Sequence, residues 1–385
     1  MNEGKSGNRS WLRVLAGLGL LLPAIVCCIS VLVLPTLGTI IQSLFGADGM
    51  AVLSWGVDNY TYLFQDRRFS EVLGFTLSSV AVRVAVVAVV PLLLALAVNE
   101  FGRVVRIPVR LLFTIPLALF APVVTALVWR LAFVPGDSFM IGTLLRGLDM
   151  PPRSLLADPE VVKRIALSID GLTTFGLACG LGLILYLAAL RGQGAEAPSW
   201  KEVRKPLIVS WMVGLLATIA LTPQSFTLSF VLTGGGFMSG IMTLALYQYV
   251  MSFGRFMVGA GAALSALSLI VAILCGLGTG LLVVFTGLRL ERVSWGKEVG
   301  LVTRGGRRKV IAVLLLLAVV FIGCIGCLLS IFPRMWNVVA SLGSPGAYPQ
   351  ALEGPPSVSI GQAWVNTVLP AFLAILLFQM PITYV

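Results

Sequence analysis

Long apolar stretches, separated by short polar segments, dominate the sequence. A helix that rises about 1.5 Å per residue needs about 20 apolar residues to cross a hydrocarbon core of about 30 Å. Eight stretches approach or exceed that length, and we predict each as a transmembrane helix: 11–44, 72–98, 107–133, 165–190, 207–222, 256–288, 310–332 and 361–385. The pattern therefore predicts an all-α fold, a polytopic membrane helix bundle with about eight transmembrane helices.

The basic residues between these stretches predict the orientation of the chain. Alternate loops carry 17 of the 27 Lys and Arg residues on one side and 8 on the other. Short cytoplasmic loops hold the excess of Lys and Arg in membrane proteins. We therefore expect a multi-pass protein of the cytoplasmic (inner) membrane, surrounded by membrane lipids, with a cytoplasmic N-terminus.

Composition excludes several classes of function. The chain is 58% hydrophobic and 11% charged, whereas about a quarter of the residues in a soluble domain are charged. It has no histidine, which excludes His-ligated metals and His-based catalytic triads. Its six cysteines all lie in apolar stretches, where a thiol packs as a small hydrophobe. We expect no metal site and no cofactor.

The loops account for the net charge of +11, so we expect no nucleic-acid partner.

Arg83 and Asp170 are charged residues that lie within predicted spans. Arg83 is about ten residues into the second span, where an arginine costs about 2.5 to 3.5 kcal/mol to insert. It needs a partner or water: either it bonds the carbonyls of a neighbouring helix or lies by Ser79 one turn away, or it faces a cavity. Asp170 is the one acidic residue that we expect to enter the membrane. A single carboxylate disfavours a proton-coupled carrier, because such carriers commonly use carboxylate relays.

The chain contains no GxxxxGK[ST] segment. Without this phosphate-binding loop we do not expect the chain to hydrolyse ATP itself. The sequence therefore does not predict an enzyme, and any ATP hydrolysis is expected on a separate chain.

Several segments carry a resemblance to a known family. They are Val57–Tyr60 with Leu63 and Phe64, then 122–130, 183–190, 232–236 with 243–247, and 259–265. Together they resemble the permease subunits of binding-protein-dependent sugar importers, the maltose and glycerol-phosphate type of ABC transporter, over roughly residues 21–288. Gly236 stands where that family usually shows proline. The resemblance implies a type I ABC importer permease-like core, a separate ATPase subunit, an external solute-binding protein and a second permease subunit.

In that family, the loop after the fourth of these spans carries an "EAA...G" signature on a helix that docks into the ATPase. Here Glu196 and Ala197 are the remnant, Pro198 replaces the second alanine, and the later glycine is missing. The resemblance implies an ATPase-coupling loop formed by Glu196, Ala197, Trp200, Glu202, Arg204 and Lys205. The alternative is a solvated basic loop that reflects topology alone.

The resemblance also implies a solute path. Its candidate residues are Gln224, Ser225, Thr227, Tyr247 and Gln248, with Arg83 as a possible cavity-facing charge and Gly234, Gly235 and Gly236 as an external loop. Neutral polar groups and aromatic faces suit a carbohydrate. The alternative is a glycine-rich external loop flanked by polar helix ends.

The residues after 300 resemble the beginning of a second permease half. A basic cluster, a new apolar span and a Pro- and Gly-rich segment follow one another, in the order found at the beginning of a partner permease. We predict a six-helix permease-like domain over residues 1–300 and, over 301–385, two helices of a second permease-like half that is cut short.

Taken together, these observations predict a transmembrane subunit of an ATP-driven importer that moves a sugar or related small polar solute. One alternative is a non-transporting assembly or regulatory membrane subunit with a degenerate ATPase-coupling loop. The other is a secondary transporter.

Overall fold

The computed structural model describes residues 19, 21–23, 25–45, 55–99, 107–109, 122–133, 158–191, 200–233, 240–287, 310, 313–314, 317 and 321. Apart from one isolated bridge between Phe45 and Trp55, the regular structure in this part of the chain is helical. The all-α prediction is therefore confirmed for the described residues.

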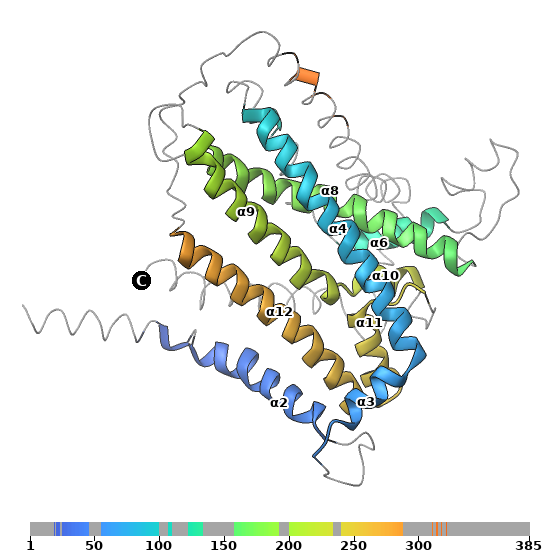
Figure 1. Cartoon of the computed structure of the whole chain (residues 1–385). Coiled ribbons are helices and arrows are strands. Elements are labelled where there is room, and N and C mark those ends of the chain that lie inside the picture. Colours follow the sequence, from blue (N-terminus) through green and yellow to red (C-terminus); the bar gives the residue numbers. More distant parts are fainter. Residues whose placement is uncertain are drawn as a thin grey trace, which may run out of the picture. The chain divides into compact units, whose positions relative to one another are not determined.

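The long described helices overlap the predicted spans, and α6 covers the end of the third, whereas α3, α10, α11 and η3 lie between the predicted spans (Figure 1). In chain order they are the π-helix η1 (Cys28–Val33), α2 (Leu34–Ser43), α3 (Asp58–Gln65), α4 (Arg67–Asn99), α6 (Pro122–Phe133), α8 (Pro159–Arg191), α9 (Trp200–Leu221), the 3-10 helix η2 (Thr222–Gln224), α10 (Thr227–Thr233), α11 (Leu244–Tyr249), the π-helix η3 (Val250–Gly254) and α12 (Val258–Thr286).

Four of the described helices are long and apolar enough to cross a membrane. They are Leu21–Ser43, Arg67–Leu96, Arg204–Thr233 and Val258–Thr286, and they coincide with the first, second, fifth and sixth predicted spans. The fourth predicted span coincides with α8, a helix of 33 residues. The last predicted span, and most of the seventh, lie outside the described residues, so the number eight stays a prediction.

The chain divides into two compact units, Met1–Gln42 with Val338–Val385, and Ser43–Asn337. Helices α3 to α12 and their polar contacts belong to the second unit. The predicted domain boundary after residue 300 lies outside the described residues and stays a prediction.

Helices α4 and α8 begin in the same way. Asp66 precedes α4, and its carboxylate Oδ1 accepts the Arg68 N–H at 2.9 Å. Asp158 precedes α8, and its Oδ1 accepts the Glu160 N–H at 2.9 Å. Both are N-caps, which satisfy backbone donors that the helix itself leaves unpaired. Local sequence thus determines where both helices start.

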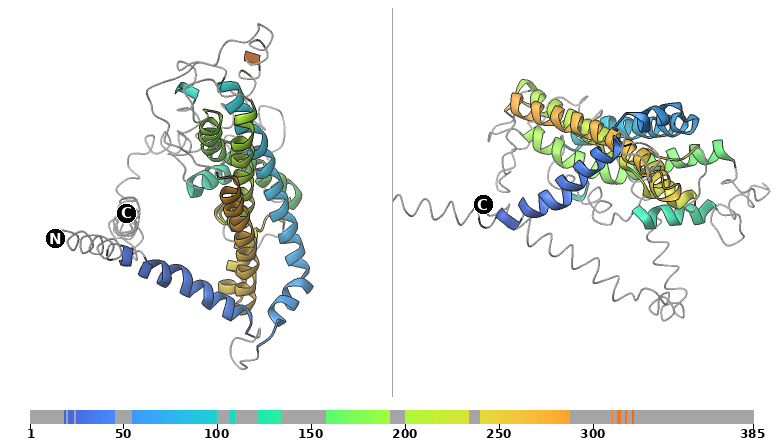
Figure 2. Two further views of the ribbon diagram at one scale, coloured as in Figure 1. Left: turned by 60° about the vertical axis from the view of Figure 1, so that its left-hand side comes forward. Right: turned by 90° about the horizontal axis from the view of Figure 1, so that it is seen from below.

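Within this unit, α4 packs most extensively against α8 and also against α9, and α9 packs against α12. Figure 1 shows α9 between α4 and α12. The left view of Figure 2 shows these three long helices aligned along a common direction. The shorter α10 packs against α6, and α11 against α12.

Two close contacts show that α4 and α8 run in the same direction. A Cβ placed on Gly171 would lie 3.1 Å from Val82 Cγ1, and one placed on Gly182 would lie 2.6 Å from Pro91 Cβ. Residue numbers therefore rise together along both helices. This agrees with the predicted alternation, in which the second and fourth spans cross the membrane in the same direction.

Two hydrophobic clusters form the core of this unit. The first joins α3, the start of α4, α11, η3 and the start of α12, with Leu63, Met251 and Leu264 fully buried. The second joins α4, α6, α8 and α10 around Phe75, Trp129 and Ile169. The polar groups described next lie among these helices.

Candidate functional site

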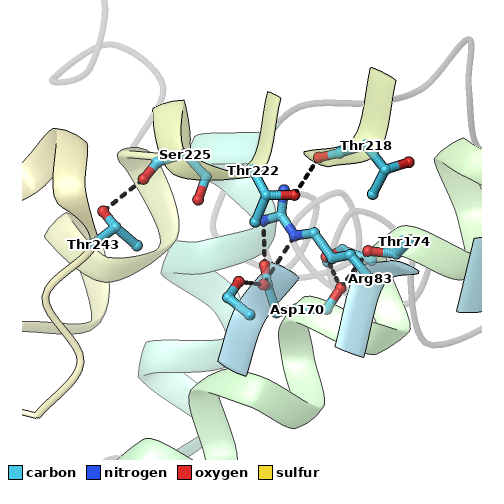
Figure 3. A network of polar contacts seen from close by, with 9 residues as sticks. Arg83, Asp170, Thr174, Thr218, Thr222, Ser225 and Thr243 are labelled. Atoms are coloured by element: carbon cyan, nitrogen blue, oxygen red, sulfur yellow. Dashed lines mark hydrogen bonds and ion pairs between the residues drawn. The ribbon is translucent and has the colours of Figure 1, made fainter. Parts of the chain in front are cut away.

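A buried ion pair connects α4 to α8. Arg83 of α4 donates from Nε to Asp170 Oδ2 at 2.9 Å and from Nη2 to Asp170 Oδ1. Ser79, one turn earlier on α4, donates its hydroxyl to Asp170 Oδ2. We call Arg83 and Asp170 the Arg83–Asp170 pair (Figure 3), and Ser79 is an additional hydrogen-bond donor to it. One carboxylate thus accepts three hydrogen bonds from a single neighbouring helix.

The pair is well shielded from solvent. The side chain of Asp170 is 6% exposed and that of Arg83 is 21% exposed, and Ser79 is buried. Charge-assisted and bidentate contacts of this kind are the strongest class of side-chain hydrogen bond. Because Asp170 is buried and Arg83 is half-buried, each charge depends on the other for compensation.

Both members of this pair were singled out in the sequence, but their contact was not predicted. The structure gives Arg83 a carboxylate partner across the helix interface, and Ser79 bonds that carboxylate as well. The sequence did contain the two charges that form the pair, a cation in the second predicted span and an anion in the fourth. What the sequence lacks is the packing that makes these two spans neighbours.

Neutral hydroxyl groups extend from this pair towards α11. Thr222 donates to Thr218 O at 2.7 Å, and Thr243 donates to Ser225 O at 2.6 Å. Thr243 also accepts the Leu246 N–H at 3.4 Å as the N-cap of α11. Figure 3 draws these side chains together with Arg83 and Asp170, and η2, which carries Thr222, packs against both α4 and α11. They bond backbone groups, as short hydroxyl side chains commonly do in helices.

Tyr247 of α11 contacts the start of α4. It is 1% exposed, and its hydroxyl donates to Asp66 Oδ2, the carboxylate that caps α4. Burial raises the pKa of the Tyr247 hydroxyl, and the hydrogen bond to Asp66 and the charge of that carboxylate raise it further. Tyr247 is therefore a neutral donor, and its hydroxyl group is already occupied.

The other predicted solute-path residues lie in more open positions. Gln224 is exposed and donates to Ala220 O at 3.2 Å. Ser225, Thr227 and Gln248 are half-buried. Gly234, Gly235 and Gly236 lie outside the described residues.

The predicted ATPase-coupling residues fall on both sides of a helix start. Glu196 and Ala197 lie outside the described residues. Helix α9 begins at Trp200 and includes Glu202, and the side chains of Arg204 and Lys205 in the same helix are exposed. These four residues were expected in a loop before the fifth span, but the structure places them in the first turns of that helix.

Asn59, in the segment that carried the first part of the resemblance, has a structural position. It is 1% exposed, and its amide donates to Ser43 O at 3.0 Å and to Phe45 O. A Cβ on Gly259 of α12 would lie 2.8 Å from that amide. Asn59 therefore holds Ser43 and Phe45 by hydrogen bonds and packs against the start of α12, where only a glycine leaves it room.

Among the described residues, no three His, Cys, Asp or Glu side chains gather in a way that could hold a metal ion. The described geometry is that of a helix bundle with polar interhelical contacts.

No protein-family profile matches the sequence, and no curated protein matches it. Solved structures do show the fold. One similar chain comes from a bacterial alginate ABC transporter in complex with an alginate pentasaccharide-bound periplasmic protein, with a TM-score of 0.55 and 18% identity over 74% of this chain and 97% of that chain.

A second similar chain comes from a bacterial ABC transporter involved in the import of the acidic polysaccharide alginate. Its TM-score is 0.53 at 18% identity, over 72% of this chain and 98% of that chain. This protein therefore shares its fold with component chains of a bacterial ABC importer.

Proposed function

We propose that this protein is a membrane-embedded subunit of an ABC-type importer for a carbohydrate. The observation that carries the proposal is the shared fold, which covers 97% of a chain from an ABC transporter. Four described helices long enough to span a bilayer and the absence of a phosphate-binding loop in the sequence support a subunit that relies on another chain for ATP hydrolysis.

The proposed solute is a sugar, an oligosaccharide or a related polar molecule. Both similar chains come from transporters of an alginate system, and the half-buried or exposed Gln224, Ser225, Thr227 and Gln248 offer neutral hydrogen-bonding groups. Such groups suit hydroxyl-rich ligands. An external binding protein would deliver this solute, and a second permease subunit would complete the path.

The proposed contact with the ATPase subunit is the segment between α8 and α9 together with the first turns of α9. Arg204 and Lys205 are exposed there, and the predicted topology places them on the cytoplasmic side. These two exposed cations could bind an acidic surface of the ATPase subunit. In this proposal the protein spans the cytoplasmic membrane with its N-terminus in the cytoplasm.

Reconstitution tests the proposal. The full chain is coexpressed with candidate ATPase, binding-protein and second permease subunits, placed in proteoliposomes, and assayed for ATP hydrolysis with and without oligosaccharide. We expect hydrolysis that the solute-loaded binding protein stimulates. Association without stimulation would favour the assembly or regulatory alternative, and gradient-driven uptake without nucleotide would favour a secondary transporter.

A matched pair of charge reversals locates the ATPase contact. Arg204→Glu with Lys205→Glu should abolish association with the ATPase subunit. The control is Lys163→Glu with Arg164→Glu, a pair of cations close to the start of α8, which should leave association unchanged. Equal binding by both variants would contradict the proposed contact.

A further inference from the structure

The Arg83–Asp170 pair lies where two helices approach very closely. At Gly171, next to Asp170, Val82 leaves no room for a side chain. At Gly182, three turns further along α8, Pro91 leaves none. Atoms at these contacts cannot move closer, and the bidentate ion pair opposes sliding. A shift of one helical turn, about 5.4 Å, would separate every donor from Asp170.

Separation of the pair would be costly in a membrane. Removing one partner from a buried ion pair costs about 3 to 5 kcal/mol, because the remaining charge stays buried without compensation. Two ion pairs are found among the described residues: this one, and Arg67 with Glu71, which lies at an exposed position. The geometry therefore favours an interface that stays closed.

The two helices joined in this way reach different regions of the protein. The last residue of α8 is Arg191, directly before the segment for which we propose an ATPase contact. The start of α4 contacts α11 twice: Asp66 accepts the Tyr247 hydroxyl, and Thr76 Oγ1 accepts the Leu244 N–H at 3.1 Å. Helix α11 contains Gln248, a residue of the proposed solute path.

We propose that the Arg83–Asp170 pair joins α4 and α8 into a single moving element, so that displacement at the C-terminal end of α8 reaches α11 through α4. Arg83, Asp170 and Ser79 are then positioning residues for transport, and they do not contact the solute. This inference rests on the proposed function as an importer subunit, but the junction itself is testable without any partner.

The partner-free test measures the distance between α4 and α8. Spin labels are attached at Leu77 and Ser168, which are exposed on α4 and α8, in the full chain in lipid nanodiscs with the six native cysteines replaced by alanine. We expect one narrow distance distribution, which broadens in Arg83→Gln and narrows again in the charge exchange Arg83→Asp with Asp170→Arg. An unchanged width in Arg83→Gln would overturn the junction, whatever the protein does.

The functional test uses the reconstituted transporter with oligosaccharide as the probe. Arg83→Gln should lose transport while ATP hydrolysis continues, because the α8 displacement no longer reaches α11. A change that merely destabilised the fold would lower both activities together. If Arg83→Gln does not accumulate, Arg83→Gln with Asp170→Asn replaces it, since no unpaired charge remains and the ionic junction is still absent.

A disulfide distinguishes a permanent junction from one that opens during transport. Val82→Cys with Gly171→Cys places two thiols at the contact where a Cβ on Gly171 would lie 3.1 Å from Val82 Cγ1, and a disulfide there needs a Cβ separation of about 3.5 to 4.5 Å. Oxidation should leave transport intact in the otherwise cysteine-free chain and restore it in Arg83→Gln. Loss of transport on oxidation alone, reversed by reduction, would overturn the proposal.

The outcomes separate the two proposals. Label distances that respond to Arg83→Gln, in a chain that no ATPase subunit binds, would retain the junction and reject the importer function. Stimulated ATP hydrolysis together with full transport in Arg83→Gln would retain the importer and reject the junction.

Discussion

Helices α4 and α12 each contain a stretch that is long and apolar enough to span a membrane, but they are held in place differently. Polar side chains of α4 and its cap bond other elements, at Asp66, Thr76, Ser79 and Arg83. In α12, the described hydroxyls all bond carbonyls of their own helix, as Ser265 does with Gly261 O.

The two helices also differ in what covers them. In the most apolar stretch of α4, 28% is buried inside the protein, compared with 6% in that of α12. Leu277, Val284 and Phe285 of α12 are exposed, as expected for side chains that face lipid. Hydropathy therefore indicates that a helix can lie in a membrane, while polar contacts and small residues decide which neighbours it has.

The largest effect should come from leaving one charge of α4 unpaired. Asp170→Ala strands Arg83, and we expect the free energy of unfolding to fall by about 3 to 5 kcal/mol. Unfolding by SDS in mixed micelles, followed by circular dichroism, measures this change.

The matched control removes both charges. Arg83→Met with Asp170→Leu should cost far less than Asp170→Ala, because well-packed apolar residues replace a buried ion pair at little cost. A double variant as unstable as Asp170→Ala would show that the loss reflects packing and not the unpaired charge.

In α12, the corresponding vulnerability is a close steric contact. A Cβ on Gly261 would overlap Ser252 Oγ and lie 3.3 Å from the backbone oxygen of Gln248, so Gly261→Ala should cost about 1 to 3 kcal/mol. Gly276→Ala is the control in the same helix, because nothing lies within 4 Å of its new Cβ. Equal stability of the two variants would contradict the packing described for α12.

A smaller effect should follow at the junction of α4 and α11. Tyr247→Phe removes the donor to Asp66, and we expect a loss of about 1 kcal/mol, measured by the same SDS unfolding. Burial and Asp66 raise the pKa of Tyr247 above the ordinary value of 10.0. The contribution of this contact is therefore complete below about pH 10 and decreases as the pH rises further.

Tyrosinate absorbance checks the pKa separately. Of the seven tyrosines, Tyr247 should ionise well above pH 10, and Tyr247→Phe should remove one late-titrating group. A difference spectrum that shows no such loss would mean that the hydroxyl is exposed to solvent.

The smallest effect should come from the contact between α9 and α4. The Trp211 indole N–H donates to Ala88 O at 2.9 Å, and Trp211→Phe should cost about 0.6 kcal/mol, typical of an interhelical hydrogen bond in a membrane. Thermal unfolding in nanodiscs measures it. A loss as large as that of Asp170→Ala would mean that α9, and not α8, is the main polar partner of α4.

Much of the helical content followed from the sequence. The second, fourth, fifth and sixth predicted spans match α4, α8, α9 and α12 within a few residues at most ends, because length and apolarity are local properties. The prediction placed Trp200–Lys205 in a loop, but α9 begins at Trp200. Charged residues lower hydropathy without preventing a helix, so a hydropathy criterion misses such helical extensions beyond the apolar core.

The candidate site was predictable only in part. Arg83 was identified as a charge that needs a partner, and the structure provides Asp170. Tyr247 was grouped with the solute path, and its role there stays a proposal, but its hydroxyl is bonded to Asp66. Residues 66 and 247 are far apart in the chain, and no local pattern in the sequence records that they meet.

By itself, the sequence determined which segments are apolar enough to span a membrane, that one arginine in such a segment needs compensation, and that the chain has no phosphate-binding loop of its own. Only the tertiary structure decided that α8 is the neighbour that compensates Arg83 and that α11 joins the start of α4. The physical reason is that apolar surface is non-directional and leaves the choice of neighbours open. Hydrogen bonds, ion pairs and the contacts of small residues depend on atoms that packing brings within a few ångströms.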